Sequence, residues 1–259
     1  MPPVRSARYV QPVSIELPRS VVTSLWLAAL SRGSAELSQA VAAIQGQDEP
    51  HTTSGGGTLS DLLTQLSTEY EVVHAALPVP GAAGVPLEAA EAALAAGEAV
   101  LVRATGQTTT TVPEVTEFGS AWEPGAMVTW QVTVSSAVVS MPDSLGEARR
   151  DLTEALELAI DALTQMDVAR WREEAATEIG QLASADVLPS IARVLPPDLD
   201  TRARDLLVRA ARLQAIVALA TEDDGAAVNM WQADQRAAAM RHVGSTARRA
   251  MMAATLSAR

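Results

Sequence analysis

The spacing of apolar residues along the chain changes near residue 140 and does not change back. Before this point, segments with strand-like and helix-like spacing alternate, whereas every later periodic segment has helical spacing. The clearest strand is residues 128–135, where valine and tryptophan alternate with polar residues. The sequence therefore predicts an α+β fold: a small mixed sheet with flanking helices in residues 1–140, followed by a C-terminal helical bundle in residues 141–259. Packing of the two parts into one compact unit is left open.

The first part combines strands with shorter helices. Strands are predicted at residues 10–17, 72–79, 99–103, 108–116 and 128–135, and helices at 18–33, 35–45, 58–66 and 87–96. Residues 70–77 also fit a helical stripe, but the β-branched run and the turn signal at Pro80-Gly81 favour a strand. Pro113 lacks a backbone donor, so its strand is expected at a sheet edge. Residues 47–57 are expected to form a mobile loop.

The helices carry recognisable start signals. Ser144 and Glu147 have the spacing of a capping box, as do Thr58 and Asp61 in the first part. Asp200 is placed to cap the helix that follows it. In the second part, helices are predicted at residues 144–166, 171–183, 201–220 and from Asp223 or Asp224 to Ala254, with a proline-rich crossing loop at 186–200.

Composition excludes several kinds of chemistry. The 259 residues contain no cysteine, and all 19 basic residues are arginine. Disulfides, thiolate metal sites and cysteine nucleophiles are therefore excluded. The absence of lysine likewise excludes a pyridoxal Schiff base and the lysine that contacts phosphates in common nucleotide-binding motifs.

The charge is acidic and unevenly distributed. The net charge is −12, yet residues 201–259 hold nine arginines and five acids, which leaves about −16 for residues 1–200. An acidic chain repels a phosphate backbone, so no nucleic-acid partner is predicted. No apolar run approaches the roughly 20 residues of a membrane span. The start of the chain also lacks the apolar stretch of a secretory signal, so a cytoplasmic location is expected.

The last helix carries the strongest candidate for a binding site. Asp224, Trp231, Gln235 and His242 follow one another at helical spacing along one face, and Asp223 precedes them. A carboxylate, an indole, an amide and an imidazole on one face suit a cleft for a polar ligand. The alternative is a partly buried helix face whose polar groups are satisfied within the fold.

Three other patterns resemble known sites but favour ordinary structure. Glu71 and His74 have a metal-ligand spacing, yet residues three apart on a strand point to opposite faces. The glycines at 55–57 precede a helix as in a dinucleotide fingerprint, but no strand leads into them. Five acids share one side of the helix at 144–166, where a solvated or salt-bridged face is expected: Glu147, Asp151, Glu154, Glu157 and Asp161. No metal and no cofactor are predicted.

Four short motifs together resemble a family of uncharacterised conserved proteins from high-GC actinobacteria. They are Leu77-Pro78-Val79-Pro80-Gly81, Gly97-Glu98-Ala99-Val100, Asp167-Val168-Ala169-Arg170-Trp171 and Glu222-Asp223-Asp224-Gly225-Ala226. The resemblance implies a bacterial cytosolic protein and supports the strand at 72–79. The family has no assigned activity, so it implies no catalytic residue.

Because the usual catalytic motifs are missing, the favoured function is a non-catalytic interaction or assembly protein. The alternative is a small-molecule or metal-dependent enzyme with a site between the two halves, using Asp223, Asp224 and His242. A homodimer is predicted, with small residues and methionines of the last helix at the interface. The alternative is that this face packs within a monomer. A protein partner is a further expectation.

Overall fold

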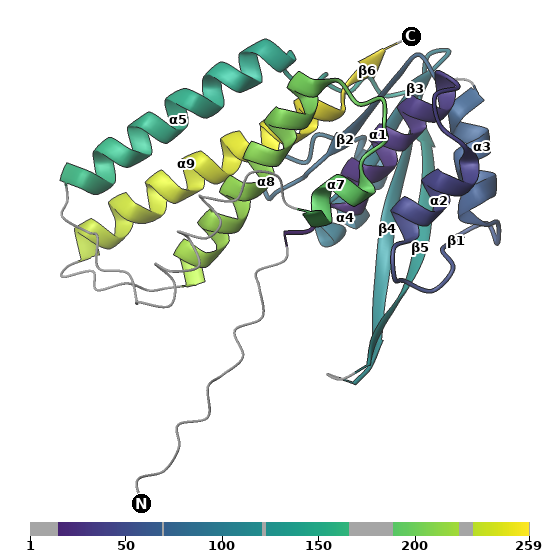
Figure 1. Cartoon of the computed structure of the whole chain (residues 1–259), viewed down its shortest axis with the longest axis horizontal. Coiled ribbons are helices and arrows are strands. Elements are labelled where there is room, and N and C mark those ends of the chain that lie inside the picture. The colour runs from purple at the N-terminus through teal and green to yellow at the C-terminus, as the bar shows by residue number, and fades with distance from the viewer. Residues whose placement is uncertain (1–14, 69, 121–122, 166–188, 223–229, 259) are drawn as a thin grey trace, which may run out of the picture.

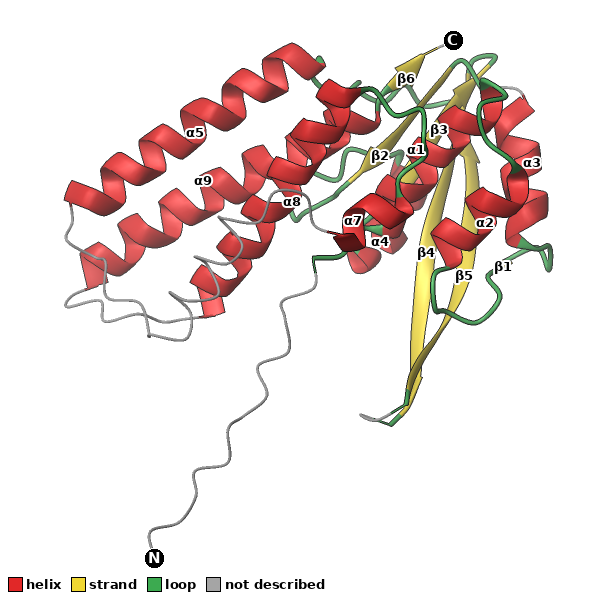
Figure 2. Cartoon of the chain, in the orientation of Figure 1, coloured by secondary structure: helices red, strands yellow, loops and turns green. Residues whose placement is uncertain are grey.

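The computed structural model describes residues 15–68, 70–120, 123–165, 189–222 and 230–258. The elements follow in the order α1 (Arg19–Ser31), α2 (Leu37–Gln45), β1 (Thr52–Thr53), α3 (Leu59–Thr68), β2 (Val72–Ala76), α4 (Leu87–Ala96), β3 (Ala99–Ala104), β4 (Gln107–Gly119), β5 (Pro124–Ser135), α5 (Leu145–Gln165), α7 (Pro189–Val194), α8 (Thr201–Glu222), α9 (Met230–Thr255) and β6 (Ser257–Ala258). The α+β class is confirmed: a mixed sheet and its helices stand beside a C-terminal helical region (Figures 1 and 2).

The sheet has six strands in the order β1-β5-β4-β3-β2-β6. The four central strands pair antiparallel with their neighbours, whereas the two-residue β1 pairs parallel with β5. At the other edge, β6 pairs antiparallel with β2. The last strand of the chain therefore completes a sheet whose other strands all come from the first half.

Alternating side chains divide the sheet into two covered faces. Val73, Val102 and Trp130 pack with α1, α2 and α3 on one face. Leu101 and Val112 pack with Ala93 of α4 on the other. Helix α1 is buried along its length from Ser20 to Ala29 because it contacts both the sheet and its neighbouring helices.

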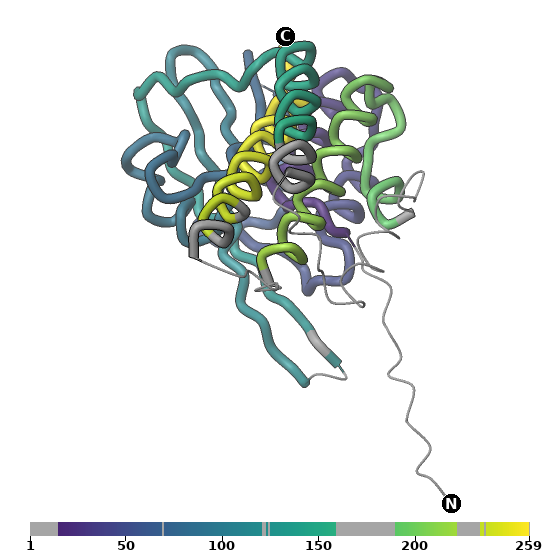
Figure 3. The backbone as a smooth tube through the Cα atoms, turned by 90° about the vertical axis from the view of Figure 1, so that its left-hand side faces the viewer, coloured from purple at the N-terminus to yellow at the C-terminus, as the bar shows by residue number. Residues whose placement is uncertain are grey.

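Helices α5, α8 and α9 lie side by side, with α9 in contact with both of the others (Figures 1 and 3). One apolar cluster joins these helices to Val21 of α1 and Ala75 of β2, so the two halves share a core. Gly244, Ala247 and Ala254 of the predicted interface, here called the small-residue face of α9, are buried in this packing. Gly244 is buried, and a Cβ atom there would lie 3.3 Å from Cγ1 of Val217 in α8. This face is therefore used within the chain, and dimerisation stays a prediction that needs another surface.

The predicted helix starts are confirmed by hydrogen bonds. Ser144 and Glu147 form a reciprocal capping box, and Thr58 and Asp61 form another. The carboxylate of Asp200 accepts from the backbone N–H groups of the first turn of α8. The strand interpretation of the segment after Tyr70 is also confirmed by β2.

Several predicted elements are corrected. Residues 15–17 form no strand, and the rest of the strand predicted at 10–17 lies outside the described residues. The loop predicted at 47–57 contains β1, and the crossing loop at 186–200 contains the short helix α7. The helix predicted at 171–183 also lies outside the described residues.

The strand that contains Pro113 was predicted at a sheet edge, and this prediction is wrong. β4 lies in the interior of the sheet, between β3 and β5, and not at its edge. However, its pairing with β3 reaches only Thr111, and Pro113 lies two residues beyond. Among the described strands, only β5 pairs with β4 at Pro113, so the missing donor weakens no pairing with β3.

Candidate functional site

The predicted ligand-binding face of the last helix is described in part. Asp223 and Asp224 lie outside the described residues, and of Trp231 only the backbone, in α9, is described. Gln235 and His242 are both exposed on α9, about two helical turns apart. Neither lines the cleft described next. A ligand-binding role for these five residues stays a prediction.

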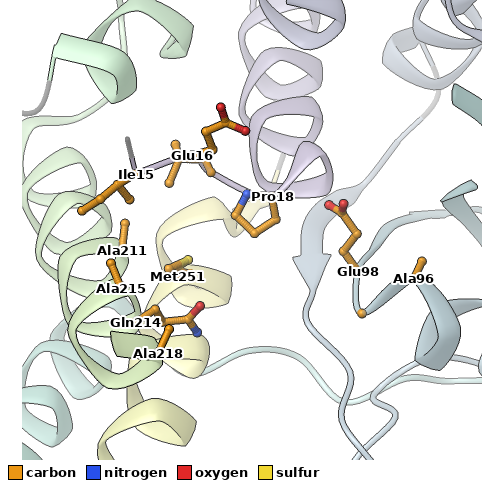
Figure 4. A pocket seen from close by; sticks show the side chains of 12 residues that line it. Ile15, Glu16, Pro18, Ala96, Glu98, Ala211, Gln214, Ala215, Ala218 and Met251 are labelled. Atoms are coloured by element: carbon orange, nitrogen blue, oxygen red, sulfur yellow. The ribbon is translucent and has the colours of Figure 1, made fainter. Parts of the chain in front are cut away.

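A cleft of about 460 Å³ lies between the two halves (Figure 4). Its walls come from residues 15–18 before α1, residues 96–98 between α4 and β3, the middle of α8, and Met251 of α9. Most of the lining is apolar, and its polar side chains are Glu16, Glu98 and Gln214. A cleft of this kind is large enough for a small organic molecule.

Glu98 is the more buried of the two carboxylates that line this cleft. It is half-buried, and one of its oxygens accepts a 2.7 Å hydrogen bond from the backbone N–H of Ser20, in the first turn of α1. Burial raises the pKa of Glu98, while the hydrogen bonds from Ser20 and the charge of Arg19 oppose that rise. The carboxylate thus serves as a cap for α1, where the helix dipole favours negative charge.

His51 belongs to a series of polar contacts that connects α1 to β5. The indole N–H of Trp130 donates to Nδ1 of His51 (3.3 Å), and Nε2 of His51 lies 3.2 Å from the carboxylate of Asp48. Arg19 donates twice to the same carboxylate. An indole can only donate, so Nδ1 accepts and the ring proton lies on Nε2. Both ring nitrogens are engaged, which gives His51 a structural role.

His74 is the second buried histidine. It lies on the α4 face of the sheet with a side chain that is 6% exposed, and its Nδ1 has no hydrogen-bond partner among the described residues. Burial lowers its pKa from 6.5 to about 4, helped by the charge of Arg103. The described residues hold no group of three His, Cys, Asp or Glu side chains that could bind a metal ion.

The strands β4 and β5 continue beyond the rest of the sheet as a long hairpin arm (Figures 1 and 2). We define the arm as residues 113–119 and 124–130, the paired residues that lie past the end of β3. Val115, Phe118 and Met127 are exposed on it, and the ring of Phe118 lies against the backbone of Gly125 on the opposite strand. All but one of the exposed large apolar side chains in the described ranges fall between residues 87 and 141.

Among the described residues, β5 has no paired strand on its outer side in the residues that follow the arm. β1 pairs only with Thr129 and Trp130, and within the described residues no strand pairs with this side of residues 131–135. We call residues 131–135 the open edge. Val132 and Val134 are 40% and 56% exposed there. Unpaired, apolar edge strands are rare in monomeric proteins because they bind other strands.

Sequence reasoning identified β5 as a strand but missed that its edge is open. The available signal was the composition of residues 124–135, which contain no charged residue. Edge strands that must stay single are usually protected by charge, and here the strand itself offers none.

Two protein-family models match this chain. The model for the N-terminal domain of the Rv1486c-like protein matches residues 20–143, and the model for the C-terminal domain matches residues 146–252. The chain therefore belongs to the Rv1486c-like proteins, an uncharacterised family named after a mycobacterial protein, with no assigned activity. This confirms the resemblance to an actinobacterial family. The comparisons with curated proteins and with solved structures find no match.

None of the helices in the described ranges is both long enough and apolar enough to cross a membrane.

Proposed function

We propose that this protein is a non-catalytic interaction protein that docks a protein partner on the arm and the open edge of β5. The observation that carries the proposal is the exposure of large apolar side chains, among them Phe118 and Met127, on a hairpin that projects from the sheet. Exposed apolar patches of this kind mark interaction sites in soluble proteins.

The experiment compares two double variants with the wild-type protein as bait in an actinobacterial lysate. Phe118→Ser with Met127→Ser removes two exposed apolar side chains from the arm. Leu87→Ser with Leu94→Ser removes two from α4 and serves as the matched control. We expect a protein that wild type and control both retain and the arm variant loses, confirmed by rebinding of that purified protein. Equal capture by all three baits would refute the docking surface.

The homodimer is a separate part of the proposal. Because Gly244 of the small-residue face packs against Val217 of α8, we propose that a second copy uses another surface. Light scattering at micromolar concentration tests this, and a mass near 27.1 kDa excludes a stable dimer without affecting the docking proposal.

A second candidate is a small-molecule enzyme working in the cleft between the two halves. The observation in its favour is the cleft itself, with Glu98 at its edge. A thermal-shift screen of metals and metabolites tests it, since a ligand at 100 times its Kd stabilises a protein by roughly 2.7 kcal/mol. A hit that Glu98→Gln abolishes would favour the enzyme over the interaction protein.

A further inference from the structure

The backbone of the open edge is arranged to accept one added strand. The carbonyl of Trp130 accepts a hydrogen bond from the backbone N–H of Ser54. The backbone C=O group of Trp130 therefore points toward the outer side of β5, away from β4. Backbone groups alternate along a strand, so Val132 and Val134 also direct their N–H and C=O groups outward. β1 has ended by this point, and no other described strand pairs with these groups, so they can pair with a partner in extended conformation.

The side chains of the open edge define what such a strand would meet. Val132 and Val134 lie exposed on one face of the sheet, so apolar residues of the partner on that face would cover them. On the other face, the two end residues of the open edge contact carboxylates from β4 and α4. Gln131 donates to Glu114 (2.7 Å) at one end, and Ser135 donates to Glu88 (3.1 Å) at the other.

The two carboxylates at the ends of the edge favour a basic partner. The sequence that contains them is also acidic, because residues 33–148 hold fourteen acidic residues and one basic residue, Arg103. Gln131 and Ser135 are four residues apart, about 13 Å along a strand, so the two carboxylates match basic residues at the first and fifth positions of the partner. A second copy pairing through its own β5 would bring its Glu88 and Glu114 into this same acidic surrounding, and like charges disfavour that pairing.

We propose that the open edge binds an extended segment of a protein partner with arginine or lysine at its first and fifth positions and apolar residues at its second and fourth. This inference rests on the proposed function and names the partner's chemistry. The partner strand adds to β5 by backbone hydrogen bonds, and its alternate side chains supply the specificity.

The test uses the full chain and a labelled synthetic peptide in which Arg-Val-Thr-Val-Arg is flanked by glycine and serine. Fluorescence anisotropy measures its affinity beside two control peptides. One has glutamate in place of both arginines, and the other, Arg-Thr-Val-Thr-Arg, places its apolar residue on the wrong face. We expect both controls to bind at least about tenfold more weakly, and binding of the first peptide to weaken as salt rises.

Matched variants locate the binding on the protein. Val134→Arg adds a like charge at the open edge, whereas Leu158→Arg adds the same charge at a comparably exposed apolar residue of α5. Glu88→Gln removes a carboxylate at the edge, and Glu91→Gln removes one from the same helix. We expect about a tenfold loss of affinity for Val134→Arg, a smaller loss for Glu88→Gln, and unchanged affinity for the two controls. The glutamate pair keeps the test valid if Val134→Arg fails to fold.

Each outcome separates the inference from the proposed function. If no peptide binds but the arm still captures a partner, the basic segment is refuted and the docking function stands. If the wild-type protein self-associates and Val134→Arg abolishes that association without any peptide binding, the edge pairs with a second copy and the inference is again refuted. Loss of both peptide binding and arm-dependent capture refutes both.

Discussion

Acidification should destabilise this protein through His74. The unfolded chain binds a proton on this imidazole near pH 6.5, whereas burial lowers the pKa in the folded protein to about 4. The contribution of the neutral imidazole is therefore complete above pH 6.5 and is lost as the pH falls toward 4. The difference between the two pKa values is equivalent to about 3 kcal/mol in total, of which about 2 kcal/mol is lost by pH 5.

The comparison that isolates this effect uses His74→Leu. Urea denaturation from pH 7.5 to pH 5, followed by tryptophan fluorescence, gives the free energy of unfolding of each protein. We expect the wild type to lose about 2 kcal/mol more than His74→Leu, because leucine cannot take up a proton. The variant should also be about 1 kcal/mol more stable at pH 7.5, since it removes the buried Nδ1 that lacks a partner. Gln235→Leu, which places leucine at an exposed position and removes no titratable group, is the control and should keep the wild-type pH dependence.

Parallel pH profiles for the wild type and His74→Leu would refute this reasoning. They would mean that His74 takes up its proton equally easily in both states, which is incompatible with its burial on the α4 face. Titration of other groups does not affect the test. Those groups are common to both proteins and cancel in the difference.

Three further changes test individual contacts. Trp130→Phe removes the donor to Nδ1 of His51 and should lower the free energy of unfolding by about 1–3 kcal/mol; a loss under about 0.5 kcal/mol in urea denaturation would contradict that hydrogen bond. Gly244→Leu should destabilise by about 1–3 kcal/mol because it overpacks Val217, and an unchanged Tm would show a looser contact between α8 and α9. Glu98→Gln should be at least as stable as the wild type at pH 7 and lose that advantage below pH 4.5. The raised pKa of Glu98 means that its ionisation opposes folding, and a variant less stable at pH 7 would contradict this.

The elements that sequence reasoning found are those whose cause is local. The capping box at Ser144 and Glu147 and the alternation in residues 128–135 each specify a conformation from a few neighbouring residues. These signals do not depend on which element packs alongside. The helix start and the strand could therefore be predicted from the sequence without knowledge of the tertiary fold.

The elements that it missed depend on distant partners. β1 and β6 are two residues each, too short to show alternation, and each exists because a longer strand lies beside it. The small-residue face of α9 indicated close packing correctly, but its partner α8 is set by the tertiary fold. Pro113 shows the same limit: its sequence rule holds at its own position, while the strand as a whole lies inside the sheet.

The extent of the open edge of β5 could not be predicted from the sequence for a related reason. An edge is open or covered according to how far its neighbour extends, and here β1 covers two of the twelve residues of β5. Residues that face outward on the covered and the open parts look alike in sequence, as Trp130 and Val132 do. Only the extent of β1 distinguishes their backbones, because β1 pairs with Trp130 and ends before Val132.

The histidines give an independent argument for docking over catalysis. A chain without cysteine or lysine depends on imidazole and carboxylate groups for most general acid and base chemistry. His51 has both ring nitrogens engaged, and His74 is buried on the face of the sheet that carries α4. His242 is the one exposed histidine of the three, and it does not line the cleft, where the carboxylate of Glu98 already caps α1. Two of the three histidines are therefore buried in the fold, which supports the proposal that the protein binds a partner through the arm and the open edge.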